Sequence, residues 1–190
     1  PGAKPGRVVS EGAGFRFQCM RSTWRKPGKH VTIGRRPPVW MGFPDVVQVG
    51  EKALVCAHND GVGHGGGGKL LVRRSEDLGL TWSEPLAVHD SGINCPRLQK
   101  LRNGSLLLLA DVGGRDPVLL DSLDGGRTWI SKRIFNPTQS GGNQVCVPSR
   151  VAELPDGSWL LVGSWYPGGK AWEGTEGELS LIHISEPTRP

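Results

Sequence analysis

The sequence of 190 residues has few sulfur-containing and few aromatic side chains: two methionines, one tyrosine and 6% aromatic residues in all. Its four cysteines are Cys19, Cys56, Cys95 and Cys146. No two of them have Cys-x-x-Cys spacing, which excludes the usual zinc-ribbon and thioredoxin-type motifs. Three lie in or beside apolar runs, so we expect buried free thiols. We also expect no metal ion and no cofactor.

Long apolar runs are absent as well, so the sequence predicts no membrane-spanning helix. Acidic residues are almost missing from the first 36 positions, where nine Lys or Arg residues accompany Glu11 alone. The net charge of +5 therefore resides in this part, and the rest of the chain is slightly acidic. This uneven distribution does not favour a nucleic-acid partner. A solvated basic leader is the main interpretation, with contact to an anionic sugar as the alternative.

Both ends of the chain differ from its middle. Residues 1–43 form the basic leader, which is rich in Gly and Pro and has a possible edge strand at residues 14–19. No signal peptide is visible at Pro1, so we expect a truncated N-terminus and predict no compartment. Residues 179–190 break the preceding pattern and look like the translation of a sequencing adapter. We expect this tail to be non-native and give His183 no role.

Glycine and proline are abundant in the sequence, with 29 and 15 residues, as in all-β proteins with many tight turns. A repeat begins at Pro44, Pro96 and Pro148, with a spacing of 52 residues. Each copy passes through a turn, Asn-Gly or Asp-Gly in two of them, into a second apolar run. This period is close to that of four-stranded propeller blades. The sequence therefore predicts an all-β fold whose blades start near residues 44, 96 and 148.

A second repeat reads Ser-x-Asp-x-Gly-x-Thr-Trp and occurs at residues 75–82 and 122–129. Its Asp can accept hydrogen bonds from turn N–H groups, its Gly can adopt a left-handed conformation, and its Trp offers a large ring to bury. The motif thus predicts two β-hairpin turns with structural roles. The shared residues are Ser75, Asp77, Gly79, Thr81 and Trp82 in one copy and Ser122, Asp124, Gly126, Thr128 and Trp129 in the other.

This motif is the Asp-box of the BNR repeat, and the chain resembles the β-propellers of the sialidase (neuraminidase) superfamily. The resemblance implies a six-bladed propeller, of which residues 44–178 would form about two and a half blades. It also implies exo-type hydrolysis of sialic acid or a related acidic glycan by a retaining mechanism. In that family the Asp-boxes lie away from the active site, so Asp77 and Asp124 are expected to be structural.

Blade topology predicts where a glycan would bind. In a four-stranded blade, the start of strand A and the loop between strands B and C (the B–C loop) lie at one end of the sheet. Polar side chains that converge there can hold a ligand. The candidates for substrate binding are Asp45, Arg97 and Arg150 at the strand starts, and His58, Arg115 and Asp116 in the loops. Structural ion pairs are the alternative for Arg97 and Arg150, and structural or solvated roles for His58.

The resemblance assigns the acid/base carboxylate to the first B–C loop, where Asp60 is the candidate. A turn at Asn59-Asp60-Gly61 is the alternative. The Arg-Ile-Pro motif of the family reads Gly42-Phe43-Pro44 here, so its arginine is missing. Arg35 or Arg36 could replace it from outside the motif.

Catalysis in the family also needs a Tyr–Glu nucleophile from later blades, so this chain is expected to be inactive by itself. Tyr166, the single tyrosine, fits a rim residue better than a nucleophile. A non-catalytic propeller that binds carbohydrate or protein is the alternative function. The pair His58 and His64 has poor spacing for a metal site, and residues 65–68 lack the Lys-Ser/Thr of a phosphate-binding loop.

Overall fold

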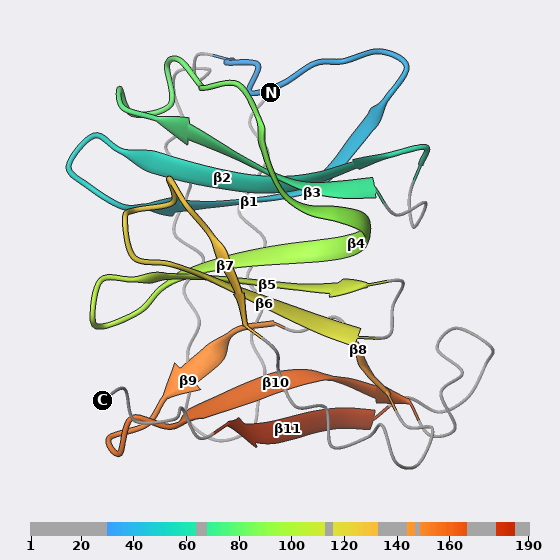
Figure 1. Ribbon diagram of the computed structural model, residues 1–190, viewed down its shortest axis with the longest axis vertical. Coiled ribbons are helices and arrows are strands. Elements are labelled where there is room, and N and C mark those ends of the chain that lie inside the picture. The colour runs from blue at the N-terminus through green and yellow to red at the C-terminus, as the bar shows by residue number, and fades with distance from the viewer. Residues whose placement is uncertain are drawn as a thin grey trace, which may run out of the picture. The chain divides into compact units, whose positions relative to one another are not determined.

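The computed structural model describes residues 30–63, 68–112, 116–132, 144–146, 149–166 and 178–184. Within these ranges every regular element is a β-strand, so the predicted all-β fold is confirmed. Figure 1 shows the strands in two antiparallel sheets. The first sheet contains β1 (Trp40–Gln48), β2 (Leu54–Gly61), β3 (Gly68–Ser75), β4 (Leu86–Lys100), β5 (Leu106–Val112), β6 (Asp116–Ser122) and β7 (Ile130–Lys132), in this order. The second contains β8 (Gln144–Cys146), β9 (Val151–Glu153), β10 (Trp159–Tyr166) and β11 (Glu178–Ile184).

These strands form successive four-stranded meanders of the kind that build propeller blades. Blade 1 consists of β1, β2, β3 and the first half of β4, and blade 2 of the second half of β4 with β5, β6 and β7. Blade 3 contains β10, paired with β8 and β9 on one side and β11 on the other. The last strand of blade 1 thus continues directly into the first strand of blade 2. The described sheets do not close into a ring.

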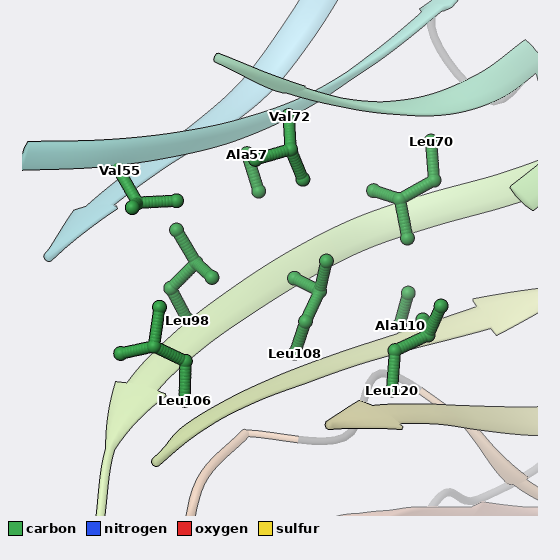
Figure 2. Packing of buried hydrophobic residues seen from close by; sticks show 9 residues of the cluster. All are labelled: Val55, Ala57, Leu70, Val72, Leu98, Leu106, Leu108, Ala110 and Leu120. Atoms are coloured by element: carbon green, nitrogen blue, oxygen red, sulfur yellow. The ribbon is translucent and has the colours of Figure 1, made fainter. Parts of the chain in front are cut away.

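Two hydrophobic cores occupy the seams between consecutive blades. The leucine run at the start of β5 serves both, because alternate side chains of a strand point to opposite faces. Each fully buried leucine contributes about 1.5–3 kcal/mol to stability. The seam between blades 1 and 2 contains Val55, Ala57, Leu70, Val72, Leu98, Leu106, Leu108, Ala110 and Leu120 (Figure 2). The seam between blades 2 and 3 contains Leu101, Leu107, Leu109, Leu119, Val151, Trp159 and Leu161.

We call β1, the second half of β4 and β9 the inner strands of blades 1, 2 and 3. Side-chain hydrogen bonds connect the inner strand of one blade to the backbone of the inner strand of the next. The carboxylate of Asp45 accepts a hydrogen bond of 2.9 Å from the N–H of Leu98. The amide of Gln99 both donates to the carbonyl of Val151, at 2.8 Å, and accepts from its N–H, at 3.0 Å. Because an amide can pair with a peptide group in this way, Gln99 extends the hydrogen bonding across the second seam.

The inner strands of blades 1 and 2 share a β-bulge at the same place in the repeat. Phe43 and Cys95 have positive φ angles of 51° and 44°, and each precedes a proline. In each case two residues of the inner strand face one residue of the next strand, which is His58 in blade 1 and Ala110 in blade 2. Such bulges bend a strand locally and often lie beside functional sites.

The two Ser-x-Asp-x-Gly-x-Thr-Trp segments form matching turns at the end of the sheet opposite the B–C loops. In the first turn Asp77 accepts hydrogen bonds from the Thr81 hydroxyl, at 2.6 Å, and from its N–H, at 2.9 Å. Asp124 and Thr128 repeat both bonds at the same distances. The Thr81 hydroxyl is the main reason why the pKa of Asp77 falls to about 2. Thr128 lowers the pKa of Asp124 in the same way.

Other expectations concern the cysteines, the tail and the membrane. Cys56 is a buried free thiol as predicted, with its pKa raised to about 11 mainly by burial, whereas the free thiol of Cys95 is only half-buried.

β11 pairs with β10 and includes residues of the predicted non-native tail. The pairing does not test their origin, which stays a prediction. No helix in the described ranges could cross a membrane.

Candidate functional site

Asp60 lies near the end of β2, where the first B–C loop begins. It pairs with Met41 of β1, and the next residue, Gly61, pairs with Trp40. The alternative of a turn at Asn59-Asp60-Gly61 is therefore wrong. The reason is that β1 begins at Trp40, inside the predicted leader, and so holds these residues in the sheet.

Two donors hold the carboxylate of Asp60. The Nη2 of Arg36 donates to Oδ2 at 2.7 Å, and the backbone N–H of Lys69 donates to Oδ1 at 2.9 Å. The side chain of Asp60 is only 7% exposed, while that of Arg36 is 60% exposed. Gly68 makes this packing possible, because a Cβ there would lie 1.2 Å from the carbonyl oxygen of Asp60. The result is a fixed, buried carboxylate under an arginine that reaches solvent.

His58 lies two residues before Asp60 within β2, so its predicted position in a loop is wrong, and it is also buried. Its Nδ1 is 3.2 Å from the carbonyl oxygen of Asn59. Its Nε2 is buried and has no hydrogen-bond partner among the described residues. The pKa of His58 is lowered, first by burial and further by the positive charge of Arg73.

Cys56, His58 and Asp60 alternate along β2, so they share one face of blade 1. We call these three residues the polar face of blade 1. The opposite face of the same strand carries Val55 and Ala57, which pack in the seam with blade 2. Along β2, side chains therefore point alternately to the polar face of blade 1 and to the hydrophobic seam with blade 2.

Among the described residues, no hydrogen bond or ion pair links Asp60 to Asp45, Arg97 or Arg150. Asp45 follows the bulge, opposite Ala57, and its carboxylate bonds the N–H of Leu98. Arg97 holds the matching position in blade 2, opposite Leu109, and its Nη1 donates to the carbonyl of Pro96 at 2.9 Å. Arg150 directly precedes β9 and is exposed. In this structure Asp45 thus joins two blades.

The B–C loop of blade 2, residues 113–115, lies outside the described residues. Asp116 is the first residue of β6, and its backbone pairs with Val112. Arg115 and His64 lie outside the described residues, as do the glycines at positions 65–67. Among the described residues, no group of three or more His, Cys, Asp or Glu side chains could hold a metal ion.

Sequence reasoning did not find the two partners of Asp60. Arg36 was considered only as a replacement for the missing Arg-Ile-Pro arginine. It is 24 residues from Asp60 and lies before the first strand, so no spacing rule connects the two. Lys69 contributes its backbone N–H, a group that every residue except proline carries. Neither partner left a signal in the sequence.

No protein-family model matches the sequence, and no curated protein matches it either. A solved structure with clear similarity is that of a protein of unknown function from Dyadobacter fermentans DSM 18053. Its TM-score is 0.62 at 18% sequence identity, over 82% of this chain and 54% of the other. The chain therefore spans about half the length of this relative. At such an identity the match shows a shared fold.

Two glycoside hydrolases match less closely. One is a GH43 enzyme engineered to display both endo-xylanase and exo-arabinofuranosidase activity, with a TM-score of 0.45 at 14% identity, over 76% of this chain and 27% of the other. The second is the GH93 α-L-arabinofuranosidase of Fusarium graminearum in complex with arabinobiose. Its TM-score is 0.47 at 16% identity, over 72% of this chain and 42% of the other.

Proposed function

We propose that the protein is a sialidase-like exo-glycoside hydrolase that acts on sialic acid or a related acidic sugar. Asp60 is its general acid/base in a retaining mechanism. The observation that supports this most is the position of Asp60: a buried carboxylate at the B–C end of blade 1, beside the exposed guanidinium of Arg36. An acidic sugar needs a cation to bind it, and the arginine supplies one next to the acid.

The geometry suggests how the two residues act in sequence. Both oxygens of Asp60 accept hydrogen bonds here, and the guanidinium of Arg36 forms an ion pair with Oδ2. The carboxylate of the substrate gives Arg36 a new partner and releases Oδ2. Asp60 then takes up a proton from solvent, transfers it to the departing glycosidic oxygen, and later regains a proton from the attacking water. Throughout, the N–H of Lys69 holds Oδ1 and fixes the orientation of the carboxyl group.

The retaining mechanism also requires a nucleophile, and we assign none to the described residues. Arg97 and Arg150 are proposed as further contacts to the sugar, because they occupy matching positions at the inner strands of blades 2 and 3. His58, Arg115 and Asp116 complete the proposed binding residues. Asp45 is proposed as a binding residue as well, and its carboxylate also accepts a hydrogen bond from the N–H of Leu98.

A non-catalytic propeller that binds carbohydrate is the second candidate. The observation in its favour is the Arg36–Asp60 ion pair itself, which engages the carboxylate that catalysis would use. In this case Arg36 and Asp60 would recognise a ligand together, and no glycosidic bond would be broken.

Hydrolysis by the complete gene product separates the two candidates. Asp60→Asn should reduce turnover of sialyllactose, a poor leaving group, by about 100-fold or more, because no acid remains to protonate the departing oxygen. Turnover of methylumbelliferyl sialoside, a good leaving group, should fall much less in its glycosylation step. Equal losses for both substrates would count against the acid role. Binding of sialyllactose without turnover by the wild type would favour the second candidate.

Arg36→Gln tests the cation, with Arg35→Gln as a matched control on the neighbouring exposed residue. The first should raise KM for sialyllactose by about tenfold or more, the usual effect of losing a charged hydrogen bond. The control should leave KM unchanged.

A further inference from the structure

The backbone geometry of blade 1 can form without an imidazole at position 58. His58 faces the bulge at Phe43 and Pro44, and blade 2 repeats this bulge at Cys95 and Pro96. The residue that faces the second bulge is Ala110, which is fully buried. The same backbone geometry is therefore compatible with a small apolar side chain. A polar ring buried here calls for another explanation than folding.

The hydrogen bond at Nδ1 defines the state of the ring. A carbonyl oxygen can only accept, so Nδ1 carries the proton that it donates to the oxygen of Asn59. Burial has the largest effect on the pKa of His58 and lowers it, against the smaller raising effects of the Asn59 hydrogen bond and of Asp60, so the neutral form of the ring is favoured. In the neutral ring with a protonated Nδ1, Nε2 holds a lone pair and accepts hydrogen bonds.

This acceptor is unused in the described part of the structure. Nε2 is buried and none of the described residues donates to it. A buried acceptor without a donor costs about 1–3 kcal/mol, and most such groups in proteins are satisfied. Asp60 lies two residues further along the same face of β2, and the exposed Arg36 borders it. Two residues of a strand span roughly 7 Å, so a sugar ring bound at Asp60 is long enough to bring one of its hydroxyl groups to His58.

We propose that His58 Nε2 accepts a hydrogen bond from a hydroxyl group of the sugar that binds at Asp60. A hydroxyl suits this place because it donates a hydrogen bond and carries no charge that would have to be desolvated at a buried acceptor. His58 is thus a specificity-determining residue that selects a sugar by the presence of a hydroxyl. The inference rests on the proposed function, because it takes the ligand of Asp60 to be a glycan.

Three substitutions separate the acceptor from the rest of the ring. His58→Asn places an amide near the position of Nδ1, so it keeps the donor to Asn59 and lacks the acceptor. His58→Gln is one methylene longer and brings an amide oxygen near the position of Nε2. His58→Ala removes both groups and reproduces the residue that blade 2 has at this place.

The test is the affinity of the complete gene product for free sialic acid, measured by calorimetry, together with the melting temperature of each variant. The affinity should fall about tenfold in His58→Asn and His58→Ala, as expected for one lost hydrogen bond. It should return close to the wild-type value in His58→Gln. Arg36→Gln and Asp60→Asn are measured in parallel.

The possible results all decide the question. Equal affinities for all three His58 variants and the wild type, with weaker binding by Arg36→Gln, would overturn this inference and leave the proposed function intact. A common loss in all three variants that follows their melting temperatures would show a structural imidazole and also overturn it. If the wild type binds no sialic acid and cleaves no sialoside, the proposed function fails, and the hydroxyl site fails with it.

Discussion

Blades 1 and 2 are built on the same frame but differ along one strand. Both have a bulge that contains a proline, the same strand order and the same turn with its Asp–Thr hydrogen bonds. Where blade 1 has Cys56, His58 and Asp60, blade 2 has Leu108, Ala110 and Val112. In blade 2 this face fills a seam, and in blade 1 it carries titratable groups. The shared backbone geometry does not require polar side chains at these three positions, so their presence in blade 1 is the best indicator of a functional site.

The seam residues should show the largest effect on stability. Leu108 is fully buried between the blades, so Leu108→Ala should reduce the free energy of unfolding of the chain by about 2–5 kcal/mol. Cys56 has the matching position on the polar face of blade 1 and is smaller, so Cys56→Ala should cost about 1 kcal/mol. Urea unfolding measures both. Equal losses would show that the two faces are packed alike and would weaken the comparison.

The turn ends of the two blades should respond alike to acid. The pKa of Asp77 is about 2 in the folded chain against 3.8 for the free group, and that of Asp124 is lowered by the same hydrogen bonds. A lowered pKa gives stability that is present above pH 3.8 and is lost as the pH falls towards about 2. The melting temperature should therefore drop across this range.

Asp77→Asn and Asp124→Asn should each remove part of this drop, by similar amounts. A drop that is unchanged in both variants would show that the turn carboxylates do not cause it. A large difference between the two variants would show that the turns are not equivalent.

The smallest effect concerns a position where the turns differ. Leu78 has a positive φ of 59°, and its counterpart in blade 2 is Gly125, with φ 70°. A left-handed conformation costs a non-glycine residue about 1 kcal/mol, and Leu78 is exposed, so it contributes little packing. Leu78→Gly should therefore raise the free energy of unfolding by up to about 1 kcal/mol, and Gly125→Leu should lower it similarly. A loss in both variants would mean that Leu78 packs against its surroundings.

The sequence predicted the features that depend on neighbouring residues. The turns follow from Asp and Gly at fixed positions, and the hairpins follow from apolar runs around turn residues. The strand bounds were less accurate. β2 extends to Gly61 because β1, which begins at Trp40, pairs with it, and the sequence places both residues outside a strand. Pairing between distant segments decided these ends.

The candidate site was predictable in its location and not in its contacts. The family resemblance placed Asp60 in the first B–C loop, and the structure has it in β2, one residue before that strand ends. The ion pair with Arg36 could not be predicted, because it joins a strand to an irregular segment. The role of Asp45 in the first seam was missed for a related reason: its partner is a backbone N–H of the next blade, 53 residues away.

The most direct test of the comparison gives blade 1 the residues of blade 2. The double variant His58→Ala, Asp60→Val should fold, because Ala110 and Val112 occupy the same positions of the same frame. Its free energy of unfolding should fall by about 2–5 kcal/mol, because the buried imidazole leaves a cavity and the hydrogen bonds of Asp60 are lost. Its affinity for free sialic acid, measured in the complete gene product, should fall below detection. Unchanged affinity in the folded variant would contradict the assignment of the site to the polar face of blade 1.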